Sequence, residues 1–265
     1  MDSTTGDNCL ERAGGLPLAM SSSTVADFVL DDDGSIPTWR EARKRMCARI
    51  SADSPHSPRF GPRWAKQARA RFLGADEQAR EFCQTTGLLT FTGSPYLTDN
   101  RDNLIPPCSF VEALTASRSA RRSAFRDVLG DAGGRWVTMR VVGAHRSGYP
   151  HEHTVVASEA QLSADDFAPV VGAHLDASPV ANKGAHGDEA IHVESDPNTD
   201  EMTGGVAYIA PDIPGVRDVL TAEQSGRTPA GVVDEAEHRR RTASVLEATG
   251  TQAVRIDRAG VDADH

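Results

Sequence analysis

The chain has 265 residues, with 38 acidic and 28 basic side chains, a formal net charge of −10 and 38% hydrophobic residues. This acid excess argues against a protein that coats nucleic acid non-specifically, although local basic patches remain compatible with it. We find no apolar run of membrane-spanning length and no basic-then-apolar leader, so we expect a cytoplasmic protein with no membrane partner. The four cysteines form no C-x-x-C pair, which favours neither a disulfide framework nor a cysteine zinc site.

The N-terminal third is predicted to contain a polar tail followed by basic helices. Residues 1–24 are small, polar and glycine-rich, and we expect them to be disordered. Residues 25–84 form a basic helical region, since the stretch from 36 to 82 has 11 basic and 5 acidic residues. Within it, "TWREARKRMCARI" and "PRWAKQARARFLGADEQAREF" have helical patterns. A solvated helical face and a nucleic-acid contact explain the basic excess equally well.

A strand and an arginine-rich helix are predicted next. Alternation in "GLLTFTGSPYL" indicates a strand, and "SFVEALTASRSARRSAFRDVLG" indicates a helix that ends at the glycines of "GDAGG". Leu114, Phe125 and Leu129 are expected to face the core. Arginines recur at helical spacing along one side of this helix, which suits either a solvated surface or contacts with DNA phosphates. These arginines are Arg118, Arg121, Arg122 and Arg126.

The second half of the chain predicts a hairpin followed by alternating helices and strands. Trp136–Val142 and His151–Val156 form an antiparallel pair across the turn "RSGYP". "SADDFAPVVGAHL" begins a helix at Ser163, and "AIHVES" is a strand. "GGVAYIAPDIPGVRDV" is helical until Pro211, which should break or kink it. "VVDEAEHRRRTASVLEATG" and "QAVRI" add a last helix and a short strand.

This order of elements indicates an α+β fold. Helices interleaved with hairpin-connected strands favour a central antiparallel sheet with flanking helices over a parallel doubly wound sheet. We place this domain at residues 85–256 and expect a flexible tail at residues 257–265.

Three histidines lie within nine residues, in "HRSGYPHEH". On a strand, His151 and His153 project from one face about 6–7 Å apart along the backbone, so their rings can converge on one metal ion. His145, across the turn, is the nearest candidate for a third ligand. An H-x-H pair is a weak signal by itself, and histidines that are close by chance or for structural reasons are the alternative.

The motifs taken together resemble the HUH superfamily of single-strand endonucleases. Within it they are most similar to the rolling-circle replication initiators of haloarchaeal plasmids and viruses, from which this chain has diverged. "LLTFT" resembles the strand of that family that ends in T-x-T, "GAHRSGYPHEHTVV" its histidine motif, and "AYIAPDIPG" its tyrosine helix. "DDFAPVVGAHLDASPVANKGAH" and "VLEATGTQAVRI" resemble further blocks, so the likeness covers about residues 55–256.

The resemblance implies a ferredoxin-like or RRM-like sheet and a specific chemistry. It implies metal-dependent, site-specific nicking and joining of single-stranded DNA, which starts rolling-circle replication. His151 and His153, assisted by His145, would hold a divalent ion, Mg²⁺ or Mn²⁺, and Tyr208 would attack the phosphate. Tyr149, in the turn, is expected to pack beside the histidines instead. The implied partners are single-stranded or hairpin origin DNA and host replication proteins.

The chain departs from this family at several positions. Gly143 stands where an acidic residue is usual, and Ala144 follows it in place of a proline. Glu152 separates the histidines where an apolar residue is usual, and it needs a partner if it is buried. Asp212 replaces the second tyrosine, either as a substitute ligand or as a sign of decay, and Pro211 interrupts the tyrosine helix. The departures favour one alternative, a degenerate relative that binds DNA without cutting it. A transposase of the same superfamily and a purely structural metal protein are further alternatives.

Overall fold

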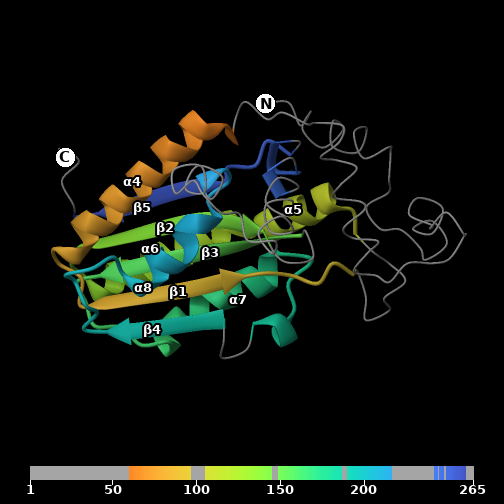
Figure 1. The fold of residues 1–265 in the computed structure, drawn as a ribbon. Coiled ribbons are helices and arrows are strands. Elements are labelled where there is room, and N and C mark those ends of the chain that lie inside the picture. Colours follow the sequence, from red (N-terminus) through yellow and green to blue (C-terminus); the bar gives the residue numbers. More distant parts are fainter. Residues whose placement is uncertain are drawn as a thin grey trace, which may run out of the picture.

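The computed structural model describes residues 60–96, 105–144, 149–186, 190–216, 242–243, 245–247 and 249–260. In these residues five antiparallel strands form one sheet in the order β4–β1–β3–β2–β5 (Figure 1). This confirms the predicted α+β fold with a central antiparallel sheet. The strands are β1 (Thr85–Phe91), β2 (Trp136–Ala144), β3 (Pro150–Ser158), β4 (Ile191–Ser195) and β5 (Val254–Ala259).

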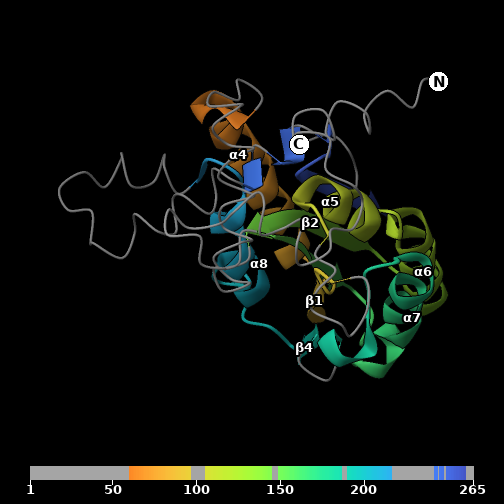
Figure 2. The ribbon, with the colours of Figure 1, turned by 90° about the vertical axis from the view of Figure 1, so that its right-hand side faces the viewer.

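Helices cover both faces of the sheet, which gives three layers (Figure 2). One face is covered by α4 (Pro62–Arg80) and α8 (Gly204–Ile209), and the other by α6 (Arg118–Ala132) and α7 (Ala168–Ala177). The helix α5 (Pro107–Thr115) precedes α6. Short 3-10 turns occur at Asp165–Phe167, Lys183–Ala185 and Ala210–Asp212. No helix in the described residues is both long and apolar enough to cross a bilayer.

The pairing of β2 with β3 sets which side chains share a face of the sheet. His151 lies opposite Gly143, and His153 lies opposite Val141. Because side chains alternate along a strand, these four residues point toward α4 and α8, whereas Glu152 points toward α6 and α7. The predicted hairpin is therefore confirmed, and the two histidines lie on one face as expected.

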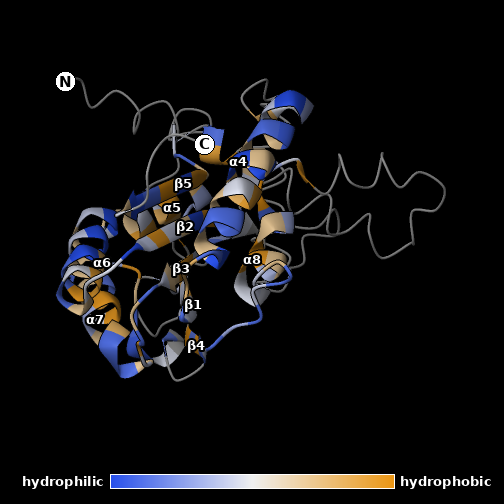
Figure 3. Cartoon of the chain, turned by 90° about the vertical axis from the view of Figure 1, so that its left-hand side faces the viewer, coloured by the Kyte–Doolittle hydropathy of each residue, from blue (hydrophilic) through white to orange (hydrophobic). Residues whose placement is uncertain are grey.

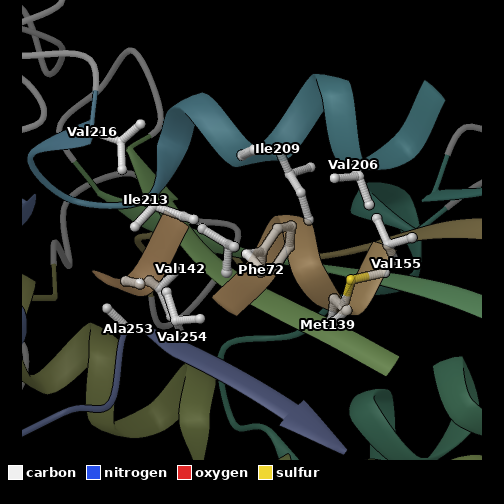
Figure 4. Close-up of a cluster of buried hydrophobic side chains, with 14 of the residues drawn as sticks. Phe72, Met139, Val142, Val155, Val206, Ile209, Ile213, Val216, Ala253 and Val254 are labelled. Atoms are coloured by element: carbon white, nitrogen blue, oxygen red, sulfur yellow. The ribbon is translucent and has the colours of Figure 1, made fainter. Parts of the chain in front are cut away.

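A separate apolar core stabilises each face. Phe72, Met139, Val155 and Ile209 belong to the core between the sheet and the α4–α8 layer, and all four are fully buried (Figure 4). The other core contains Phe91, Phe125, Phe167 and further residues of the α6–α7 layer. Figure 3 shows hydrophilic residues alternating with apolar ones along α4 and α6, as expected of helices that cover a sheet with one side.

Two predicted helices meet interruptions in the structure. The single helix expected from 109 to 130 is wrong, because α5 ends at Thr115 and α6 begins at Arg118. At the junction the buried Ser117 donates a hydrogen bond to the Leu114 carbonyl (3.2 Å) and contacts Nδ1 of His174 (2.8 Å), so tertiary contacts hold the break. Pro211 acts as predicted: α8 stops at Ile209 and a 3-10 turn follows.

Several predictions concern residues outside the described ranges. The polar tail, the first basic helix, His145 and most of the helix predicted from 232 to 250 fall there. β5 extends to Ala259, three residues past the domain boundary placed at 256. Cys83 is a free, buried thiol.

Candidate metal centre

Three side chains meet on the face of the sheet that α8 covers. His151 and His153 come from β3, and Asp212 comes from the 3-10 turn that follows α8. One ligand atom from each residue lies within 4.8 Å of the other two. The two imidazole centroids are 4.3 Å apart, and His153 is buried while the other two side chains are partly exposed. The group has the composition and spacing of a metal-binding site.

Gly143 leaves the space into which this cluster fits. A Cβ atom at position 143 would lie 3.0 Å from Nε2 of His151 and 3.3 Å from Oδ2 of Asp212. Contacts this short force the neighbouring atoms to shift, so any side chain at 143 would crowd the cluster. Gly143 and Asp212 thus complement each other relative to the HUH pattern that the sequence resembles: Gly143 lacks the usual carboxylate, and Asp212 brings a carboxylate to the same place.

His153 is oriented by the strand next to it. Its Nδ1 hydrogen-bonds with Oγ1 of Thr90 at 3.0 Å, across the pairing of β1 with β3. A hydrogen bond to one ring nitrogen fixes the orientation of the imidazole and leaves the other nitrogen, Nε2, as the ligand atom. Burial lowers the pKa of His153 to about 4, so the ring is neutral near pH 7. A neutral imidazole is the form that binds metals.

The donor set fits a divalent transition ion better than Mg²⁺. Two imidazoles and one carboxylate suit ions such as Mn²⁺ or Zn²⁺, whereas Mg²⁺ prefers oxygen ligands in octahedral geometry. Ligand atoms about 2.1 Å from one ion lie at most about 4.2 Å apart. The observed limit of 4.8 Å therefore requires only a small side-chain adjustment to bring all three onto one ion.

Tyr208 lies beside the cluster on α8. Its ring centroid is 5.7 Å from that of His153, with an interplanar angle of 81°. The side chain is 62% exposed and borders a cavity of about 240 Å³ between α8, β1 and β4. Gly205 allows α8 to approach the sheet, because a Cβ there would lie 3.0 Å from Cγ2 of Val155. The tyrosine ring is therefore close to His153, and its exposed side chain is accessible to a large substrate.

The other histidines and Tyr149 have structural contacts. Both ring nitrogens of the buried His174 are hydrogen-bonded, to Oγ of Ser117 (2.8 Å) and to the Thr92 carbonyl (2.9 Å). Nε2 of His186 accepts a hydrogen bond from the backbone N–H of Thr92 (3.3 Å). Tyr149 was expected to pack beside the histidines, and the structure buries it against Phe110 with its hydroxyl donating to the Ile105 carbonyl.

Glu152 lies at the centre of a buried ion cluster on the opposite face. Oε2 accepts from Nε of Arg118 and Oε1 pairs with Nη1 of Arg121, each at 2.7 Å, while Nε of Arg140 lies 3.6 Å from Oε2. Burial alone would raise the pKa of Glu152, but the charges of these arginines outweigh it and hold the pKa far below its usual range. Three arginines therefore provide the counter-charge that this buried carboxylate needs.

The structure brings together only part of the predicted site. His151, His153 and Tyr208 converge, and Asp212 joins them as the third described ligand, while His145 lies outside the described residues. The arginines of α6 are on the other face. They do not form one solvated stripe, since Arg121 is 3% exposed and faces the sheet with Phe125 and Leu129. Contact between these arginines and DNA stays a prediction, for which Arg122 and Arg126 retain exposed surface.

The thermal and chemical stability of the metal-free chain should decrease as the pH falls below about 6.5. Burial lowers the pKa of both His153 and His174 to about 4. Between these values the unfolded chain takes up protons that the folded chain excludes, so unfolding becomes more favourable by up to about 1.4 kcal/mol per histidine per pH unit. Urea unfolding in EDTA at several pH values between about 5 and 7.5 measures this slope. The variant His174→Gln should show a smaller slope, and an unchanged slope would contradict the assignment.

The fold and the cluster together define an antiparallel α+β protein with a candidate metal centre beside an exposed tyrosine. The chain belongs to the family described as "Putative rep protein (DUF1424)", whose model matches residues 46–260. This supports, at a coarser level, the predicted likeness to replication initiators, while membership of the HUH superfamily stays a prediction.

The chain is also similar to a haloarchaeal protein. It is 33% identical over 175 residues to the "Uncharacterized 36 kDa protein" of Halobacterium salinarum, in an alignment that covers 61% of this chain and 53% of the relative. The chain thus spans about half the length of the curated relative that it matches. No solved structure matches the chain.

Proposed function

We propose that this protein initiates DNA replication by nicking and rejoining single-stranded DNA, with Tyr208 as the nucleophile. The observation that carries the proposal is the placement of an exposed tyrosine ring 5.7 Å from a histidine of a three-residue metal-binding cluster. The family description supports the role in replication, and the resemblance to HUH endonucleases supports the chemistry. His151, His153 and Asp212 would hold a divalent ion, for which the donor set favours Mn²⁺ over Mg²⁺.

The chemistry assigned to Tyr208 is a reversible transfer of a phosphodiester. The phenolate oxygen of Tyr208 forms a bond with phosphorus, the bond to the 3′ oxygen breaks, and that oxygen takes up a proton. The products are a 5′-phosphotyrosine and a free 3′-hydroxyl, which can prime synthesis. The ion, when bound, polarises the phosphate and stabilises its developing charge. Attack by the released 3′-hydroxyl on the phosphotyrosine rejoins the strand.

Asp212 would supply the acidic metal ligand that the resembled family carries at the position of Gly143. It occupies the position of the second tyrosine in the family pattern, so this chain would act through one nucleophile. Its carboxylate reaches the space beside Gly143, where the family carries its own acidic residue. We therefore assign the third ligand to Asp212, with His145 as a further candidate from the turn.

The replacement Asp212→Asn should weaken Mn²⁺ binding at least about ten-fold, because it removes the only carboxylate of the described cluster. Isothermal titration of the metal-free chain with MnCl₂ measures the affinity. Asp165→Asn removes an exposed carboxylate outside the cluster and serves as the matched control, with unchanged affinity expected. The exchange variant Gly143→Asp/Asp212→Gly should recover binding, since it returns a carboxylate to the same space. Wild-type affinity in Asp212→Asn would remove Asp212 from the site.

An adduct assay with the wild-type protein distinguishes this proposal from a non-cutting relative and from a transposase. Labelled single strands that tile the DNA around the gene are incubated with the protein and Mn²⁺ or Mg²⁺, and covalent adducts are separated under denaturing conditions. An adduct supports the proposal, and its position at an origin or at terminal repeats separates an initiator from a transposase. DNA binding without an adduct in either ion would identify a non-cutting relative. Exposed Arg122 and Arg126 are the α6 positions at which we propose contacts with the DNA backbone.

A further inference from the structure

A small pocket opens on the face of the sheet opposite the candidate metal centre. It lies between α6 and the strands β2 and β3, and its volume is about 40 Å³. The rings of Phe125 and Trp136 form apolar walls, and both residues are 7% exposed. A buried water needs about 10–15 Å³ by this kind of measure, so the pocket can hold a group a few times larger than one water.

The charge around this pocket is strongly unbalanced. Five arginines line it together with only two carboxylates, Glu152 and Asp257, which leaves a formal excess of 5 − 2 = 3 positive charges. Glu152 is shared by three of the arginines, and Asp257 is shared by Arg122 and by Arg255 from outside the pocket. The side chains of Arg118, Arg121 and Arg140 are at most 18% exposed, and because buried charges are costly unless they are paired, this group favours a further anion.

The arginines also present hydrogen-bond donors that lack acceptors. Arg121 is 3% exposed, its Nε donates to Oγ of Ser117 (3.0 Å) and its Nη1 pairs with Glu152, but its buried Nη2 has no hydrogen-bond acceptor. The buried Nε atoms of Arg122 and Arg140 also lack acceptors. Three guanidinium groups that line one pocket therefore each retain an unsatisfied donor.

We propose that this pocket binds a phosphate-class oxyanion through Arg121, Arg122 and Arg140. Guanidinium groups match the oxygens of phosphate in geometry and charge, and their hydrogen bonds to such oxygens are stronger than neutral ones. The phosphate can be a free ion or the terminal phosphate of a nucleotide, since both present the same chemistry. Burial and the charges of neighbouring arginines lower the pKa of Arg140 to about 10, and a bound anion would reverse this effect. The site lies on the opposite face from His151 and Tyr208 and shares Arg122 with the DNA contacts proposed above, so its test measures anion binding without DNA.

Thermal unfolding of the full chain in EDTA tests the proposal, with sodium phosphate titrated against NaCl at constant ionic strength. Binding to the folded state raises the Tm in a saturable way. The wild type and the control Arg63→Gln, an exposed residue of α4, should show this rise. Arg140→Gln and the more exposed Arg122→Gln should require at least about ten-fold more phosphate for the same shift. Arg122→Gln keeps the test valid if Arg140→Gln fails to fold.

Two further ligands distinguish the source of the phosphate. A deoxynucleoside 5′-monophosphate that binds more tightly than inorganic phosphate identifies a nucleotide terminus, whereas equal or weaker binding identifies the free ion. The deoxynucleoside without phosphate should give no shift, and a shift with it would overturn the assignment of the ligand class. A response equal to that of NaCl, or an unchanged phosphate response in both arginine variants, would overturn the site itself.

Discussion

A chain with the substitution Tyr208→Phe is expected to form the covalent adduct with single-stranded DNA at least about a thousand-fold more slowly than the wild type. The substitution removes only the hydroxyl oxygen that we propose attacks the phosphate. Because Tyr208 is 62% exposed, removal of its hydroxyl should leave the fold and the metal affinity unchanged. The measurement is the yield of labelled protein–DNA adduct against time, in the divalent ion that supports the wild type.

The matched control for this experiment is Tyr149→Phe. Tyr149 is buried, and its hydroxyl donates to the carbonyl of Ile105, so its loss should cost about 1 kcal/mol of stability and leave the adduct intact. If Tyr208→Phe forms the adduct as the wild type does, another residue is the nucleophile. If only Tyr149→Phe abolishes it, the assignment of the two tyrosines is reversed.

Replacement of Glu152 by alanine is expected to lower the free energy of unfolding by about 3–5 kcal/mol. The carboxylate is fully buried and pairs with Arg118, Arg121 and Arg140, so its removal leaves buried guanidinium groups without a counter-charge. Glu152→Gln keeps the shape and part of the hydrogen bonding, and should cost less. Urea unfolding at neutral pH gives both values.

A surface ion pair provides the comparison for Glu152. Glu159 pairs with Arg135 at 3.2 Å, and both side chains are roughly two-fifths exposed. Such pairs contribute little because water already screens them, so Glu159→Ala should lower the free energy of unfolding much less than Glu152→Ala does. Equal losses in Glu152→Ala and Glu159→Ala would show that the buried cluster has no special role in stability.

The alternation of strand β3 separates two kinds of chemistry. His151 and His153 point to the α8 face and belong to the candidate metal cluster, whereas Glu152 between them points to the α6 face and pairs with arginines. Two-residue periodicity therefore places a candidate metal centre and a cationic pocket back to back on one strand. The family departure at Glu152 is compatible with the histidine pair because the two never share a face.

Local patterns in the sequence were sufficient to predict the hairpin, the common face of His151 and His153, and the end of α8 before Pro211. Each of these depends on strand alternation or on the missing backbone donor of proline, which act within a few residues. The need of Glu152 for a partner also followed from its position between residues of the opposite face. These features required no knowledge of how the elements pack.

Only the tertiary structure decided which distant groups complete the two clusters. Asp212 lies 61 positions beyond His151 in the sequence, and it reaches the histidines because α8 packs on the sheet and Gly143 leaves room. Arg121 was expected on an accessible side of the helix, either solvated or in contact with DNA, but it faces inward, because the buried carboxylate of Glu152 lies beneath it on β3. Helical spacing determines which residues share a side, whereas the partner across the layer determines whether that side is buried.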